Sequence, residues 1–393
     1  MPWEPLTEEQ VEIRDLVRSL ARDRIAPRAA EIDASHEFPW DVVELFREHE
    51  VFGLLYDEAY GGTGTGTLVA LAAIEEVSKV CATSGLILAV QELGSLGLKL
   101  AGAEEQKERY LPRLASGEWL AAYALTEAGS GSDSAAMRTT ARREGDEYVL
   151  DGSKRFITNA SVASLYTVFA KTDPSSGHSG ISAFVVEADT PGFEVARLEP
   201  KMGISGSTTG ELSFENARVP ADSLLGEEGE GFKIAMRILD RSRPGVAAQG
   251  LGIAQGATDY ALEYARTRET MGKPIAEHQL IAAKLADMET ACEAARGLLY
   301  RFGRMVDDGA PEAELTKASA MAKLHCTDTA MWVSTEAVQI LGGYGYIKEY
   351  PVERMMRDAK ITQIYEGTNE IQRLVIAREM LKESRAFLLA GVA

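Results

Sequence analysis

The spacing of apolar residues changes twice along this chain, from helical to strand-like and back to helical. Between Glu8 and Ile25 apolar residues fall at the i, i+3, i+4 and i+7 positions of one helix face, and similar faces recur up to about residue 114. Beyond Trp119 come short runs rich in β-branched and aromatic residues, separated by Asp, Gly, Ser and Pro. These runs are residues 148–150, 165–170, 181–186 and 211–214. The separation of the two patterns predicts an α+β protein.

After residue 230 helical patterns dominate to the end of the chain. One long apolar stripe consists of Met288, Ala291, Cys292, Ala295, Leu298, Leu299 and Phe302. The Ala-rich helices around it favour close antiparallel packing, as in a four-helix bundle. We therefore expect a helical N-terminal domain (1–121), a middle β domain (122–229) and a helical C-terminal domain (230–393). The glycine run at residues 61–66 is expected to be a loop, since no strand precedes it and it lacks the spacing of a nucleotide-binding fingerprint.

The composition excludes several classes of function. The 41 basic and 60 acidic residues give a net charge of -19, which argues against general affinity for nucleic acid or anionic membranes. No apolar run approaches the roughly 18 residues that would span a bilayer. The three cysteines lack metal-ligand spacing and the five histidines form no H-E-x-x-H motif, so we expect buried structural thiols and no metal site. The residues after Met1 lack a leader pattern, and we expect a cytoplasmic protein.

The segment Tyr365-Glu366-Gly367-Thr368 places an acid beside a glycine, directly before a run with helical spacing. A carboxylate in this position interacts favourably with the helix dipole, and most such side chains are exposed to solvent. The alternative is that the side chain leaves the turn, points into a cleft and serves as a base. Three further segments bear on this choice: residues 123–133 (YALTEAGSGSD), 156–160 (FITNA) and 339–346 (QILGGYGY).

Together the four segments resemble the acyl-CoA dehydrogenase family, and the resemblance extends from about Leu6 to about Leu381. It implies the three-domain fold of that family, an FAD cofactor and a fatty acyl-CoA substrate. It also implies that Glu366 removes the α-proton of the thioester while a hydride moves from the β-carbon to the flavin, which yields a trans-2-enoyl-CoA. Electrons would then pass to an electron-transfer flavoprotein. We expect the acyl chain to displace water and raise the pKa of Glu366 toward neutrality.

By the same resemblance, the cofactor contacts residues from several parts of the chain. The segment after Tyr123 offers hydroxyls and glycine amides that suit a polar ring edge or a phosphate, although a simple Ser/Gly turn has the same composition. Arg268 suits a pyrophosphate, because its fork of donors meets two oxygens at once. The implied cofactor residues are Tyr123, Leu125, Thr126, Ser132, Phe156, Ile157, Thr158, Arg268, Gln279, Gln339, Gly342, Gly343, Thr368 and Glu370.

The resemblance also implies substrate contacts and an assembly. The implied substrate residues are Ser132, Asp240, Arg243 and Gly367. A structural alternative for Arg243 is a salt bridge. Phe156 stands where Trp is common in the family, and Met271 replaces the usual Phe. Because the family's Arg268 segment reaches the FAD of a neighbouring subunit, a homotetramer built as a pair of dimers is implied.

Two other functions stay open at this point. An acyl-CoA oxidase shares the motifs but usually carries a longer C-terminal region, and a non-catalytic scaffold for flavin or acyl-CoA would have no need of Glu366. The motifs do not determine the length or branching of the acyl chain. One observation does bear on the substrate: no basic residue lies between Lys79 and Lys99, the region that lines the acyl pocket in the family. A dicarboxylic acyl group such as glutaryl would have its distal carboxylate unpaired there.

Overall fold

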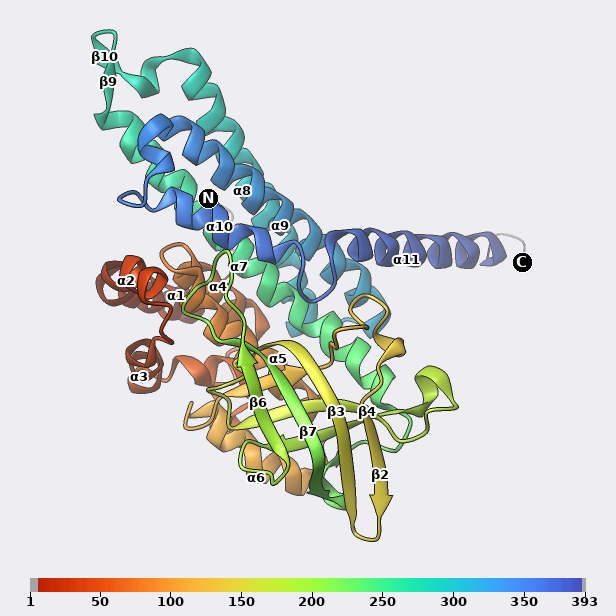
Figure 1. The fold of residues 1–393 in the computed structure, drawn as a ribbon. Coiled ribbons are helices and arrows are strands. Elements are labelled where there is room, and N and C mark those ends of the chain that lie inside the picture. Colours follow the sequence, from red (N-terminus) through yellow and green to blue (C-terminus); the bar gives the residue numbers. More distant parts are fainter. Residues whose placement is uncertain (1–5, 391–393) are drawn as a thin grey trace.

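The computed structural model describes residues 6–390, which fold in the predicted order of helices, sheet and helices (Figure 1). The α+β class is confirmed. The N-terminal helices are α1 (Glu8–Leu20), α2 (Ala29–Ser35), α3 (Trp40–Glu48), α4 (Thr67–Ser78), α5 (Ala82–Ala101) and α6 (Glu104–Ala115). Thr7 caps α1 and forms a capping box with Gln10, which fixes where the first helix begins. The glycine run at residues 61–66 is a loop, as predicted.

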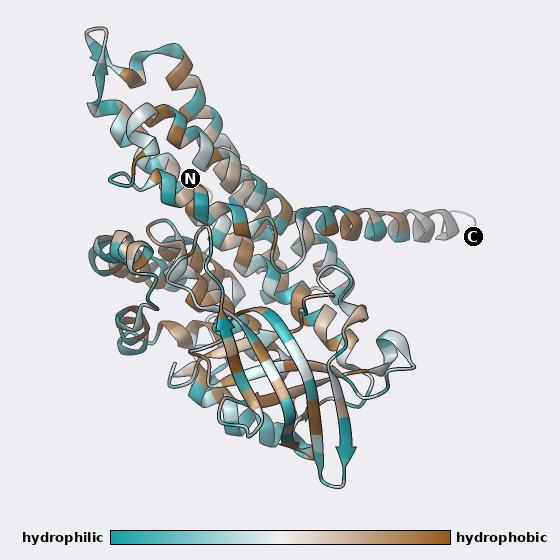
Figure 2. Cartoon of the chain, in the orientation of Figure 1, coloured by the Kyte–Doolittle hydropathy of each residue, from teal (hydrophilic) through white to brown (hydrophobic). Residues whose placement is uncertain are grey.

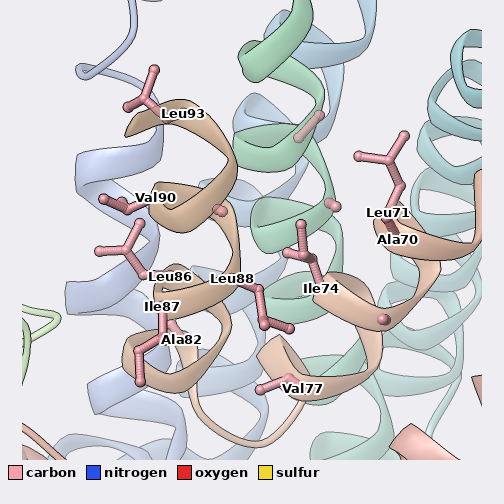
Figure 3. Close-up of a cluster of buried hydrophobic side chains, with 14 of the residues drawn as sticks. Ala70, Leu71, Ile74, Val77, Ala82, Leu86, Ile87, Leu88, Val90 and Leu93 are labelled. Carbon is pink, nitrogen blue, oxygen red and sulfur yellow. The ribbon is translucent and has the colours of Figure 1, made fainter. Parts of the chain in front are cut away.

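The helical residues between 67 and 101 form two helices, because the chain turns at Cys81, whose backbone is extended, between α4 and α5. The two helices then pack side by side and are buried nearly all round. In Figure 3 Leu88 of α5 points toward α4, where Ile74 and Val77 lie. In α1, Leu16 belongs to the apolar face predicted between Glu8 and Ile25, but it is 48% exposed, so only part of that face is covered.

The middle of the chain forms one twisted sheet (Figure 1). Its strands are β1 (Ala121–Ala124), β2 (Thr140–Glu144), β3 (Glu147–Thr158), β4 (Leu165–Lys171), β5 (Ile181–Glu187), β6 (Phe193–Leu198), β7 (Thr209–Pro220) and β8 (Leu224–Leu225). The order is β6-β7-β3-β2-β4-β5-β8, and β1 pairs in parallel with β4. All four predicted runs lie within strands. The sheet has its own aromatic core, which includes Tyr148, Tyr166, Phe184 and Phe214.

The C-terminal part consists of long helices and a small hairpin. These are α7 (Gly231–Thr267), α8 (Gln279–Asp307), α9 (Glu312–Leu341), α10 (Val352–Thr362) and α11 (Asn369–Ala390), with β9 (Glu269–Thr270) and β10 (Lys273–Pro274) between α7 and α8. The predicted apolar stripe is confirmed on α8, where Met288, Cys292, Ala295, Leu299 and Phe302 are buried. Cys81, Cys292 and Cys326 are all buried and free, as expected. Helix α11 extends away from the rest of the molecule (Figure 1).

Helix α7 connects the parts of the molecule, because it packs against α4, α5, α8 and α9. Small residues allow this close approach: a Cβ added at Gly256 would lie 2.0 Å from the carbonyl oxygen of Lys79. Further toward the start of α7, a Cβ at Gly245 would lie 3.5 Å from that of Ala89. Contacts with α5 move back along that helix as α7 advances, because Gln249 Nε2 donates to the carbonyl of Ala82 at 2.8 Å. The residues just before Gly245 consequently lie level with those just after Ala89.

Candidate active site

Glu366 lies in the turn between α10 and α11, and its backbone is left-handed. Its φ is 53°, and that of Gly367 is 93°. For a residue with a Cβ this conformation costs about 1–2 kcal/mol, so surrounding contacts must hold it. Three side chains do so by donating to backbone carbonyls of the turn. Arg243 Nε donates to Glu366 O at 3.2 Å, and Gln372 Nε2 and Lys323 Nζ each donate to Gly367 O at 2.9 Å.

The Glu366 side chain points toward α7. Its Oε2 accepts a hydrogen bond of 2.6 Å from Oγ of Ser242. Burial raises the pKa of Glu366 to about 7, although the hydrogen bond from Ser242 and the positive charges of Lys323 and Arg243 oppose this shift. The carboxylate of Glu92 adds to the rise. The group is therefore a carboxylate whose basicity matches neutral pH, which is what a general base requires.

The amide of Glu366 is available to a ligand. Among the residues that the structure describes, its N–H donates to no acceptor. The amides of the neighbouring residues Ile364 and Tyr365 both bond to the carbonyl of Ile361. A free N–H on the same residue as a base of raised pKa can bind an oxygen that gains charge while the base takes a proton nearby.

Asp240 and Arg243 form an ion pair on α7. Arg243 Nη1 donates to Asp240 Oδ1 at 2.7 Å, and the Thr316 hydroxyl donates to Oδ2 at 2.7 Å. Burial lowers the pKa of Arg243 and raises that of Asp240. The structural alternative for Arg243, a salt bridge, thus describes its contacts. The same guanidinium reaches the turn of Glu366, so it lies in the candidate site as well.

Tyr123, at the end of β1, brings the sheet to this site. Burial raises the pKa of its phenol, and the charges of Glu366 and Arg243 act on it as well, so all three groups lie near one another. The hydroxyl is buried, and it has no hydrogen-bond partner in the described part of the chain. A buried hydroxyl of this kind is normally satisfied, which makes it a candidate contact for a bound polar group.

A buried ion pair between Glu127 and Lys154 holds the predicted loop after Tyr123 against strand β3. Lys154 Nζ donates to Glu127 Oε1 at 2.8 Å and to the carbonyl of Leu125 at 3.2 Å. Burial lowers the pKa of Lys154 to about 8. The carbonyl of Thr126 accepts from the amide of Arg155 at 2.8 Å, which ties this loop to β3. Sequence reasoning missed this ion pair, because nothing in the spacing of the two residues shows that they meet.

The end of β3 presents an open aromatic ring. Phe156 has a φ of 60° and is 58% exposed, and the guanidinium of Arg155 lies 5.1 Å from the centre of its ring. Ile157 is buried and Thr158 is half-buried. The Nε of Arg155 and the hydroxyl of Thr208 are both buried, and neither meets a partner within the described chain. An open aromatic face beside unsatisfied polar atoms fits a planar ring with a polar edge.

A second group of predicted residues lies far from the first. A cavity of about 450 Å³ is lined by Arg268, Gly343 and Tyr344, among others. The Arg268 guanidinium lies 5.4 Å from the centre of the Tyr344 ring. Arg268 follows Arg243 by 25 residues of α7 and its C-cap, which is about 37 Å along a helix. Figure 1 shows the β9–β10 hairpin, next to Arg268, at the opposite end of the molecule from the sheet.

The remaining predicted residues lie at helix ends and on the surface. Gln279 is the first residue of α8 and is exposed, and Gln339 is exposed in the last turn of α9. Gly342 comes directly after α9 and has a φ of 62°. None of these three lines the cavity of Arg268. Ser132 is exposed in its loop. Thr368 caps the start of α11 by accepting from the amide of Ile371 at 3.4 Å, and Glu370 is exposed in its first turn.

The described residues contain neither a group of metal-ligating side chains nor a membrane-spanning helix. No three His, Cys, Asp or Glu side chains there are grouped to hold a metal ion. In the same residues, no helix combines the length and apolar character that a membrane crossing needs.

Comparison with known proteins places the chain in a family. Three family models match: the acyl-CoA dehydrogenase N-terminal domain at residues 7–118, the middle domain at 122–217 and the C-terminal domain at 229–381. A cyclohexane-1-carbonyl-CoA dehydrogenase of Geobacter metallireducens is 48% identical over 381 residues, which cover 96% of this chain and 99% of that protein.

Solved structures agree with this result. The butyryl-CoA dehydrogenase of Megasphaera elsdenii is 44% identical with a TM-score of 0.94, covering 97% of this chain and 100% of that one. An acyl-CoA dehydrogenase of Bacillus anthracis complexed with FAD is 36% identical with a TM-score of 0.90, covering 97% of this chain and 68% of that one. This chain therefore belongs to the acyl-CoA dehydrogenase family.

Proposed function

We propose that this protein is an FAD-dependent acyl-CoA dehydrogenase in which Glu366 is the catalytic base. The observation that carries the proposal is the combination found at one residue. Its carboxylate has a pKa of about 7, and its own backbone N–H is free among the described residues. An α-proton next to a thioester is hard to remove because the enolate is high in energy. A base at this point can take the proton, and a hydrogen-bond donor beside it can stabilise the negative charge that develops on the thioester oxygen.

In this mechanism the thioester carbonyl accepts from the amide of Glu366. The carboxylate removes the α-proton, and its hydrogen bond from Ser242 holds it in one orientation. The three donors to the turn keep the amide and the carboxylate in fixed relation, so no reorganisation is needed when charge develops on the carbonyl.

The residues around Tyr123 and Phe156 fit FAD, because an exposed aromatic ring lies beside buried polar atoms without partners in the described chain. We propose Tyr123, Leu125, Thr126, Ser132, Phe156, Ile157 and Thr158 as its contacts in the same subunit. When bound, FAD supplies the acceptor for the hydride of the substrate β-carbon. Phe156 covers less ring surface than a Trp would, and we propose Ser132 as a contact of both cofactor and substrate.

We further propose that FAD lies between subunits. Arg243 lies near Tyr123, and Arg268 is about 37 Å from Arg243 along α7. That distance is too long for one dinucleotide to contact both Tyr123 and Arg268 in a single chain. We propose that a partner subunit supplies the second group of contacts, so that one FAD reaches both groups. These contacts are Arg268, Gln279, Gln339, Gly342 and Gly343. Exposed apolar side chains also support assembly, notably Met271 at 94%, Leu280 at 80% and Leu381 at 68%. Figure 2 shows apolar residues recurring along the projecting part of α11. A homotetramer is the assembly we propose.

The substrate is an acyl-CoA, and two of the similar proteins bear on the kind of acyl group. One relative acts on cyclohexane-1-carbonyl-CoA and a solved neighbour on butyryl-CoA, as their names state. Both acyl groups are small and uncharged at the far end. We propose a small uncharged acyl group here as well, and electron-transfer flavoprotein as the acceptor.

The test is anaerobic reduction of the purified flavoprotein by a panel of thioesters from butyryl- to palmitoyl-CoA. The panel should also include isovaleryl-, isobutyryl-, cyclohexane-1-carbonyl- and glutaryl-CoA. Loss of the flavin colour with at least one substrate, together with appearance of the enoyl-CoA, is the expected result. A flavin that no acyl-CoA reduces would favour a binding scaffold. Stoichiometric hydrogen peroxide in air would favour an acyl-CoA oxidase.

A further inference from the structure

Lys323 of α9 is a fully buried lysine beneath the turn that carries Glu366. Its side chain has no solvent exposure. The ammonium donates to the carbonyl of Gly367 at 2.9 Å and to Oδ1 of Asn369 at 2.8 Å. Asn369 in turn donates to the Thr327 hydroxyl at 2.9 Å and to Asp328 at 2.7 Å. Lys323 is therefore fixed in position and connects α9 to the first residues of α11.

Both acceptors of Lys323 are neutral, which is unusual for a buried cation. Within the part of the chain that the structure describes, no carboxylate lies within ion-pair distance of its ammonium. Burying a cation without a paired charge is costly, and a neutral donor would satisfy two carbonyl oxygens at a lower cost. The charge of Lys323 therefore requires an explanation other than hydrogen bonding. The one acid whose charge acts most strongly on it is Glu366.

We propose that Lys323 is a positioning residue for proton removal by Glu366: its ammonium fixes the left-handed turn through Gly367 O and keeps the neighbouring carboxylate ionised. The inference rests on the proposed function of Glu366 as the base. Because the ammonium of Lys323 is buried and binds the carbonyl of Gly367, it stabilises the carboxylate without forming a contact that the substrate must displace.

The electrostatics of the site agree with this role. Burial lowers the pKa of Lys323 to about 7, and the charge of Glu366 opposes that shift. Conversely, the charge of Lys323 lowers the pKa of Glu366. The other charged groups that face Lys323 are Arg243 of α7, Asp328 of α9 and Glu370 of α11. Glu366 is also influenced by Glu92 of α5. The two groups titrate in the same range and are coupled, so removing one charge must move the titration of the other.

The experiment compares the pH dependence of anaerobic flavin reduction by butyryl-CoA, or the best substrate found, in three holoenzymes. Lys323→Met keeps the length of the side chain and removes its charge, whereas Lys323→Arg keeps the charge. In Lys323→Met we expect the rising limb of the rate to move up by about one pH unit, with roughly a fivefold loss at pH 7 and about a tenfold loss at pH 6. In Lys323→Arg the rising limb should move by no more than about half a pH unit. An unmoved limb in Lys323→Met would overturn the proposal.

A matched control separates electrostatics from packing. Thr327→Val removes a hydroxyl from the same network but no charge. It should lower Tm without moving the pH limb. If Thr327→Val moved the limb as far as Lys323→Met does, the effect would come from the turn geometry alone, and the electrostatic part of the proposal would be wrong.

A second measurement does not depend on catalysis. A lysine whose pKa falls from its ordinary value to about 7 on folding binds fewer protons in the folded than in the unfolded state above pH 7. Its contribution to stability therefore rises with pH between about 7 and 10. Tm of the wild-type holoenzyme should rise over this range relative to Lys323→Gln. Parallel curves would contradict the proposal even if no acyl-CoA reduced the flavin, a result that would count separately against the proposed function.

Discussion

The hydroxyl of Ser242 donates a hydrogen bond of 2.6 Å to the carboxylate of Glu366, across 124 residues of sequence. Helix α7 and the turn before α11 therefore present side chains to the same point. The contact has two consequences. It stabilises the ionised form of the carboxylate, and it shows that a longer side chain at position 242 would occupy the space that the Glu366 carboxylate fills now.

Removing the hydroxyl should make Glu366 harder to ionise. In Ser242→Ala the carboxylate loses a charge-assisted hydrogen bond, so we predict that its pKa rises by about one unit. Because Glu366 is the proposed base, we expect the rising limb of the pH–rate profile to move to higher pH. The rate of flavin reduction should fall about tenfold at pH 6 and little at pH 9. Equal losses at both pH values would indicate a change in geometry instead.

The base can also be moved from one segment to the other. We predict that Glu366→Gly reduces flavin reduction by roughly 10²- to 10⁴-fold and that adding Ser242→Glu restores part of it, since both side chains point to the same place. The control is Glu366→Gly with Ser242→Gln, which fills the space without supplying a base. Rescue by Gln as well as by Glu would show that packing had been restored. If the variant with Glu366→Gly and Ser242→Glu stayed inactive, only the inference about position 242 would be contradicted.

The fold and the motif-bearing parts of the site could be predicted from the sequence, because they depend on local patterns. Strand β2 was missed because it is polar and largely exposed, which removes the apolar signal that marks a buried strand. Strand β6 was missed because it is short and its residues are largely exposed in spite of their apolar character. Lys323 could not be found, because a lysine between Ala322 and Leu324 reads as a solvated residue in a helix. Its acceptors include a backbone carbonyl 44 residues away, which leaves no pattern in the side chains.

Arg268 is predicted to hold FAD across a subunit interface. Arg268→Ala should therefore lower the ratio of flavin to protein and weaken the assembly in parallel, since one side chain serves both. Arg266→Ala is a matched control, because Arg266 is two residues away, exposed and paired with Glu263 at 3.5 Å. Absorbance and light scattering measure the two quantities. Full flavin occupancy in Arg268→Ala would count against the proposed contact.

Glutaryl-CoA is predicted to be a poor substrate. The contact of Gly245 with Ala89 places Glu92, one turn further along α5, level with Ser242. The charge of Glu92 also reaches Glu366. Burial raises the pKa of Glu92, and the charges of Lys99 and Arg241 oppose this rise. A distal carboxylate in this region would compete with Glu92 for these cations, so we expect kcat/KM for glutaryl-CoA to be at least about 100-fold below that for butyryl-CoA. Glu92→Gln should reduce the difference in kcat/KM between butyryl-CoA and glutaryl-CoA. Comparable turnover of the two thioesters by the wild type would contradict the prediction.

The central claim, that Glu366 is the base, is tested most directly by anaerobic stopped-flow reduction of the flavin in Glu366→Gln. The amide keeps the shape of the side chain and can still meet Ser242, but it has no basic oxygen. With flavin content and acyl-CoA binding preserved, we predict that reduction slows by roughly 10²- to 10⁴-fold relative to the wild type. Reduction of the Glu366→Gln flavin at the wild-type rate would contradict the assignment.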